Sequence, residues 1–114
     1  MSQRAAIRFL EQSTFGPVLS QLTAVETGGM EPFLSTQFQA PVSQYPDPDP
    51  TLFDDSSLQV VFFQNAMNSQ ASSDQLRQRT VFALNQIWVI SGNKVSMPKF
   101  FTPYLRVLNA IHRP

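Results

Sequence analysis

Apolar residues recur along the chain three and four positions apart, which is the spacing that places them on one face of an α-helix. The pattern first covers Arg4–Gln12, and a second segment has Pro17 in its first turn and stops at Gly28-Gly29. A third segment covers Glu31–Gln39. We therefore predict three short helices, whose expected apolar positions are Ala6, Phe9, Leu10, Val18, Leu19, Leu22, Val25, Phe33, Leu34 and Phe38.

The segment from Ala40 to Pro50 reads APVSQYPDPDP and interrupts this pattern. Its prolines fix the backbone φ angle, remove hydrogen-bond donors and disfavour helix at each preceding residue. We predict an extended connector here. Its carboxylates, with Asp54 and Asp55, could offer oxygen ligands to Ca²⁺, but the glycine turn and terminal glutamate of an EF-hand loop are missing. The prediction is therefore a solvated connector without a specific calcium site.

The segment Ser57–Asn68 has two apolar stripes at helical spacing instead of one. A helix with apolar side chains around so much of its circumference needs cover on two sides. One stripe consists of Leu58, Val61, Phe62 and Ala66, and the other of Val60, Phe63 and Met67.

The segment 74–91 shows the same feature in a longer helix. Ser72 and Gln75 match a capping box, and Asp74 suits the positive end of the helix dipole. A broad apolar arc would face the core, while Phe82 and Val89 fall on the far side. We therefore predict a central helix with neighbours on both sides; the alternative is that Phe82 and Val89 are singly exposed. The arc consists of Leu76, Ala83, Leu84, Ile87, Trp88 and Ile90.

Arg77 falls inside this arc. There it either extends to solvent or pairs with a carboxylate or a helix C-terminus under a neighbouring element. After Ser91-Gly92-Asn93 a last helix is predicted, with Thr102 as its cap and Pro103 at its first position. No strand-like alternation appears, so the predicted fold is all-α: a compact bundle of about five to six short helices with a proline-rich connector. The chain, 1–114, would be a single helical domain or an N-terminal fragment of a larger protein.

Composition narrows the classes of function. Lys and Arg total 8 and Asp and Glu total 8, so the net charge is zero and we predict no nucleic-acid partner and no membrane partner. The absence of Cys excludes disulfides and thiolate chemistry. No apolar run approaches the roughly 18 residues of a membrane span, and the N-terminus lacks a signal-peptide core. We expect a soluble chain, whose localisation stays unknown.

Candidate catalytic residues are few. His112 is the only histidine, and its place near the C-terminus is a poor base for a catalytic triad. Glu11 with Glu26 or Glu31 would form a carboxylate pair only if the fold brought them together. We predict no catalytic residue, no metal ligand and no cofactor.

Two blocks of the sequence, RFLEQSTFGP near the start and DQLRQRTVFALNQIWVIS in the middle, resemble a known family. They are similar to characteristic blocks of the large bacterial family catalogued as domain of unknown function 1800, and they stand in the expected order. The resemblance covers this chain but only the N-terminal part of the family. It implies a bacterial, mainly helical protein, often exported, and no established reaction.

Two hypotheses about function remain. The first is a helical interaction or assembly module, because two helices are apolar on two sides and no catalytic set is evident. The second is the N-terminal part of an enzyme whose active site is completed by residues beyond Pro114. Under the first hypothesis we expect a homo-oligomer, most simply a dimer, or cover from the missing C-terminal part of a longer chain. The predicted interaction surface consists of Phe63, Met67, Phe82 and Val89.

Overall fold

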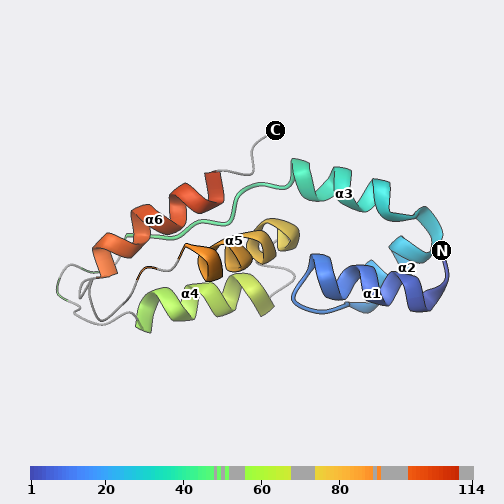
Figure 1. Ribbon diagram of the computed structural model, residues 1–114, viewed down its shortest axis with the longest axis horizontal. Helices are drawn as coiled ribbons and strands as arrows, with labels where there is room; N and C mark the ends of the chain where they lie inside the picture. The colour runs from blue at the N-terminus through green and yellow to red at the C-terminus, as the bar shows by residue number, and fades with distance from the viewer. Residues whose placement is uncertain are drawn as a thin grey trace.

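The described residues contain six helices and no strand, which confirms the predicted all-α fold (Figure 1). The computed structural model describes residues 1–47, 49, 51, 56–67, 74–88, 90 and 98–110. None of the helices in these ranges is long and apolar enough to cross a membrane. The helices are α1 (Gln3–Ser13), α2 (Leu19–Gly28), α3 (Met30–Gln39), α4 (Ser56–Met67), α5 (Gln75–Ile87) and α6 (Pro98–Ala110).

The helices form two groups along the long axis of a molecule that measures 49 × 23 × 22 Å. Helices α1, α2 and α3 lie at one end, and α4, α5 and α6 lie at the other (Figure 1). Helix α5 contacts α4 and α6 in its own group and α1 and α3 in the other. The prediction that this helix is central, with neighbours on both sides, is therefore confirmed.

The first group has a small apolar core. Its fully buried residues are Ala6, Leu10 and Val25. Phe9 and Phe33 pack against this cluster. The two rings also contact each other edge to face, with 5.4 Å between their centroids. Helix α2 ends at Gly28, as predicted, because the next residue, Gly29, has a φ of +84° that residues with a Cβ rarely adopt.

An aromatic cluster joins the two groups. Phe15, in the loop after α1, lies 6.0 Å from Phe62 of α4 and 6.0 Å from Phe82 of α5, measured between ring centroids. The Phe62 and Phe82 rings are 5.9 Å apart. The guanidinium of Arg79 lies 5.5 Å from the Phe15 centroid and 5.8 Å from the Phe82 centroid, a cation–π arrangement. This cluster fixes α4 and α5 against the first group.

The connector after α3 is extended and is held by buried polar groups of α5 and α6. Asp74, the N-cap residue of α5, accepts hydrogen bonds from the Ser43 amide at 3.0 Å and from the Ser43 hydroxyl. Asn109 of α6 donates to the Ser43 carbonyl oxygen at 3.4 Å. Gln78 donates to Asp74 at 3.2 Å and to the Asn109 side-chain oxygen at 3.3 Å. The connector thus supplies polar partners to two helices that follow it.

Arg77 contacts both a carboxylate and a helix C-terminus, the two partners that the sequence analysis proposed as alternatives to solvent. Its side chain is 3% exposed, and its Nε lies 3.3 Å from Asp74 Oδ2, an ion-pair contact rather than an aligned hydrogen bond. Its Nη1 donates to the Asn109 carbonyl oxygen in the last turn of α6 at 3.3 Å, and Nη2 makes a longer contact of 3.5 Å with the Ala40 carbonyl oxygen. The guanidinium therefore binds a carboxylate and a helix C-terminus instead of extending to solvent.

The end of the connector is fixed through Tyr45, which is almost fully buried. Its hydroxyl donates to Gln78 Oε1 at 3.3 Å, and Arg106 donates twice to its carbonyl oxygen, at 2.9 and 3.1 Å. Burial raises the pKa of Tyr45 to about 12, and the nearby Asp74 carboxylate adds to this rise while the Asn65 amide opposes it.

Several predicted boundaries are wrong. Helix α2 begins at Leu19, so Pro17 precedes it instead of starting it. Helix α5 ends at Ile87 instead of continuing to residue 91. Helix α6 begins at Pro98, which leaves Pro103 inside the helix and Thr102 buried in it, so Thr102 is not its cap. The helix starts earlier than predicted because Pro98 also fits the first helical position. It continues through Pro103 because this proline removes only one backbone hydrogen bond of the helix. Ser72 lies outside the described residues.

The predicted apolar faces are only partly right. Leu58 and Ala66 of α4 are buried as expected, but Ile87 and Trp88 are exposed while Gln78 of α5 is buried. The polar residues of α5 are buried because the connector and α6 supply their hydrogen-bond partners. In the first group, the predicted core positions that are exposed instead are Val18, Leu19 and Phe38.

Candidate functional site

The outward face of α4 is apolar and exposed. Val60, Phe63 and Met67 have exposed fractions of 54%, 57% and 78%. They are spaced three and four residues apart, so they form one row along the helix, which we call the α4 stripe. The opposite side of α4 is buried through Leu58 and Ala66.

Helix α4 contains no charged residue between Ser56 and Met67. An exposed helical face normally carries charges of both signs, which keep it hydrated and discourage association. The polar residues beside the stripe, Gln59 and Gln64, are exposed but neutral. A contiguous apolar row with only neutral neighbours is typical of a surface that another protein segment covers.

The stripe continues into a groove between α4 and α6. Phe63 lines both the outward face and a pocket of about 500 Å³, which we call the α4–α6 groove. Figure 1 shows α4 and α6 on either side of α5. The groove is lined by Leu58, Gln59, Phe62, Phe63, Asn85, Ile90, Phe101, Tyr104 and Leu105.

Tyr104 and Asn85 are polar residues in the lining of this groove that contact each other. The Tyr104 hydroxyl lies 3.1 Å from Asn85 Oδ1 and also hydrogen-bonds the carbonyl oxygen of Trp88, the C-cap residue of α5. Partial burial raises the pKa of Tyr104. None of the lining residues named above is charged. The groove therefore suits an apolar, uncharged occupant that can accept or donate a hydrogen bond.

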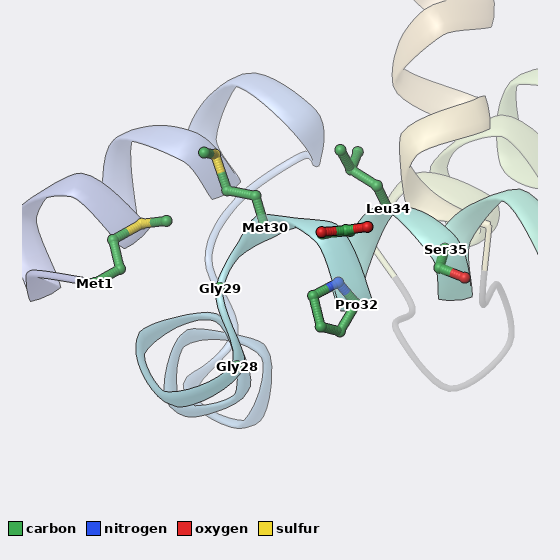
Figure 2. Close-up of a pocket in the computed structure, with 8 residues that line it drawn as sticks. Met1, Gly28, Gly29, Met30, Pro32, Leu34 and Ser35 are labelled. Atoms are coloured by element: carbon green, nitrogen blue, oxygen red, sulfur yellow. The ribbon is translucent and has the colours of Figure 1, made fainter.

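A second hollow, of about 820 Å³, lies where the start of the chain meets the turn between α2 and α3 (Figure 2). The Met1 amino nitrogen donates to the Glu26 carbonyl oxygen at 2.7 Å, which holds the chain end beside Gly29. Figure 2 shows that the flexible side chains of Met1 and Met30 and the backbone of the glycine turn form much of its wall. It lacks the rigid aromatic walls of the α4–α6 groove, so it is the weaker candidate.

The structure describes three of the four predicted interaction residues and places them in two settings. Phe63 and Met67 lie together on the α4 stripe. Phe82 is half-buried in the aromatic cluster, and Phe62 separates it from Phe63, with 5.5 Å between the Phe62 and Phe63 centroids. Val89 lies outside the described residues. Phe63 and Met67 are therefore brought together, and Phe82 supports them from beneath.

The other candidate residues of the sequence form no site within the described part of the chain. Asp47 pairs with Arg106 at 2.9 Å. Asp49 accepts hydrogen bonds from the Thr51 hydroxyl and amide, which lower its pKa. His112 and the Asp54-Asp55 pair lie outside the described residues. Among the residues that are described, no group of three or more His, Asp and Glu side chains is placed to hold a metal ion.

No protein-family model, no curated protein and no solved structure gives a significant match to this chain. The functional argument therefore rests on the geometry of the α4 stripe and the α4–α6 groove.

Proposed function

We propose that this chain is a helical interaction or assembly module that holds an apolar protein segment against the α4 stripe and the α4–α6 groove. The observation that carries the proposal is the exposure of Val60, Phe63 and Met67 on a helix without a single charge. The chemistry of this surface suits binding, because its side chains are hydrocarbon, thioether, amide and phenol groups.

The energetic benefit of covering this surface is substantial. Phe63 leaves 57% of its surface in water, which is about 100 Å² of the roughly 150–250 Å² that an aromatic side chain can bury. At about 25 cal/mol per Å², covering Phe63 alone contributes roughly 2–3 kcal/mol before the entropy of association is subtracted. Phe63 stands in the middle of the stripe and at the edge of the groove, so it is the expected centre of binding energy.

The partner segment is either a second copy of this chain or a further part of a longer chain, as the family resemblance implies. The alternative function is an enzyme whose site is completed by residues outside this chain, whereas an exposed and uncharged apolar row is a feature of a binding surface. We therefore carry the interaction module forward as the function of this chain.

A dye that fluoresces in apolar sites tests whether the surface is open. At low micromolar protein concentration, the folded chain should increase the fluorescence of anilinonaphthalene sulfonate, and Phe63→Ser should reduce this increase several-fold. The matched control is Phe38→Ser, which changes another exposed phenylalanine, on α3. It should leave the dye signal largely unchanged.

Circular dichroism must show that all three proteins are folded, because unfolded or molten chains also bind the dye. An absence of dye binding by the folded wild type, or equal binding by Phe63→Ser, would mean that the surface is already covered within the chain. That result would refute the proposed function.

A further inference from the structure

We infer that the segment covering this surface is α4 of a second copy of the chain, packed antiparallel across a two-fold axis. The inference rests on the proposed function and names its partner. Three properties of α4 carry it, namely its charge, the spacing of its stripe and the size of its exposed area.

The absence of charge makes the face complementary to itself. In a two-fold interface every surface patch meets its own copy, so a charged patch would meet a like charge. Helix α4 has no charged residue to create such repulsion. The flanking Gln59 and Gln64 carry neutral amides that both donate and accept hydrogen bonds, so neither brings a like charge into such an interface.

The spacing of the stripe fixes an antiparallel register. Val60 lies three residues before Phe63, and Met67 lies four residues after it. If the two-fold axis passes between Phe63 and Gln64, the small Val60 of one copy faces the partner's Met67. A flexible methionine opposite a small valine fills the space between two helices without strain. The two Phe63 rings then lie beside the axis, each near the other copy's groove.

The exposed area predicts a weak dimer. Phe63 exposes about 100 Å², and the three residues of the stripe together expose on the order of 300–400 Å² in each copy. Two copies would then bury about 600–800 Å² from the stripe alone, below the roughly 1,200 Å² of a stable interface. Residues lining the groove add to this area. We therefore expect a weak, reversible dimer that forms at high protein concentration.

Sedimentation equilibrium over a wide concentration range measures the association directly. The wild type should show a reversible monomer–dimer equilibrium, and Phe63→Ser should raise the dissociation constant about tenfold or more. Phe38→Ser should keep the wild-type value. Both substitutions lie at exposed positions, so they should leave the fold intact, which circular dichroism checks.

A charge-pair rescue tests the register. Val60→Lys and Met67→Glu should each weaken the dimer about tenfold, because each places an unpaired charge against an apolar side chain. The double variant should regain most of the association, since the antiparallel register brings each lysine to the other copy's glutamate. The two positions are seven residues apart on one helix, so they do not pair within a copy. A double variant that associates no better than the singles would refute this register.

The dye and sedimentation results separate the two proposals. A monomer at high micromolar concentration that still binds the dye through Phe63 would overturn the second copy as partner and leave the interaction module standing. A monomer that does not bind the dye would overturn both. A dimer that is unaffected by Phe63→Ser would show that copies associate through another surface, which also overturns this inference.

Discussion

The buried ion pair between Arg77 and Asp74 should dominate the stability of the second helical group. The substitution Arg77→Met keeps most of the apolar stem of the side chain but removes the guanidinium with its charge and its donors. Asp74 would keep its hydrogen bonds from Ser43 and Gln78 but lose the charge of Arg77. The Asn109 carbonyl oxygen would lose a donor as well.

The expected cost follows from the burial of both partners. Asp74 is 0% exposed and Arg77 is 3% exposed, and removing one partner of a buried ion pair costs about 3–5 kcal/mol. We expect about 3 kcal/mol, the lower end, because Asp74 keeps its other hydrogen bonds. Small domains unfold with about 5–15 kcal/mol in total, so the variant should be folded but only marginally stable.

Urea unfolding, followed by circular dichroism and by the fluorescence of the single tryptophan, Trp88, measures this cost. Combining Arg77→Met with Asp74→Asn should cost at least about 1 kcal/mol less than the sum of the two single changes, because the pair is coupled. Arg4→Met changes an exposed arginine on α1 and should cost no more than about 0.5 kcal/mol. A cost below about 1 kcal/mol for Arg77→Met, or strict additivity in the double variant, would refute the reasoning.

Three further predictions use the same unfolding assay. Because burial raises the pKa of Tyr45 to about 12 from 10.0, the folded state holds this proton more tightly than the unfolded state, so the contribution of Tyr45 to stability is constant below pH 10 and is lost as the pH rises towards 12. The loss is about 2–3 kcal/mol and should disappear in Tyr45→Phe; an unchanged pH profile in that variant would contradict the assignment. Leu10→Ala, in the fully buried core of the first group, should cost about 2–5 kcal/mol, and a cost near zero would show that this core is not tightly packed. Asp47→Asn, which removes an exposed ion pair with Arg106, should lower the free energy of unfolding by less than about 1 kcal/mol. A loss as large as that of Arg77→Met would show that exposure does not determine how much an ion pair stabilises this protein.

The helices could be predicted from the sequence because their determinants are local. The apolar spacing of α1 places Ala6 and Leu10 in the core, and the glycine turn ends α2 where the pattern stops. The second stripe of α4 was also readable, and so was the absence of charge from this helix. Two of the four predicted interaction residues, Phe63 and Met67, follow directly from that stripe.

Features that depend on distant parts of the chain could not be predicted in this way. Gln78 lies outside the predicted apolar arc of α5, and it is buried because Tyr45 and Asn109, more than thirty positions away, bond to it. The α4–α6 groove combines Phe63 with Tyr104, which sequence spacing alone cannot bring together. The residues Thr102-Pro103 predicted the wrong start for the last helix, because Pro98 starts the same helix earlier.

The connector also sets an order for folding. Ser43 bonds to Asp74, 31 positions later, and to Asn109, 66 positions later, whereas the α1–α2–α3 group is built from neighbouring helices. Contacts between near neighbours form quickly, and contacts that close long loops form late. Until the connector lies in place, Asp74 lacks the Ser43 donors that make its burial favourable, so α5 and α6 cannot close on each other. We therefore expect the first group to assemble early and the second to close around the connector in a later, cooperative step.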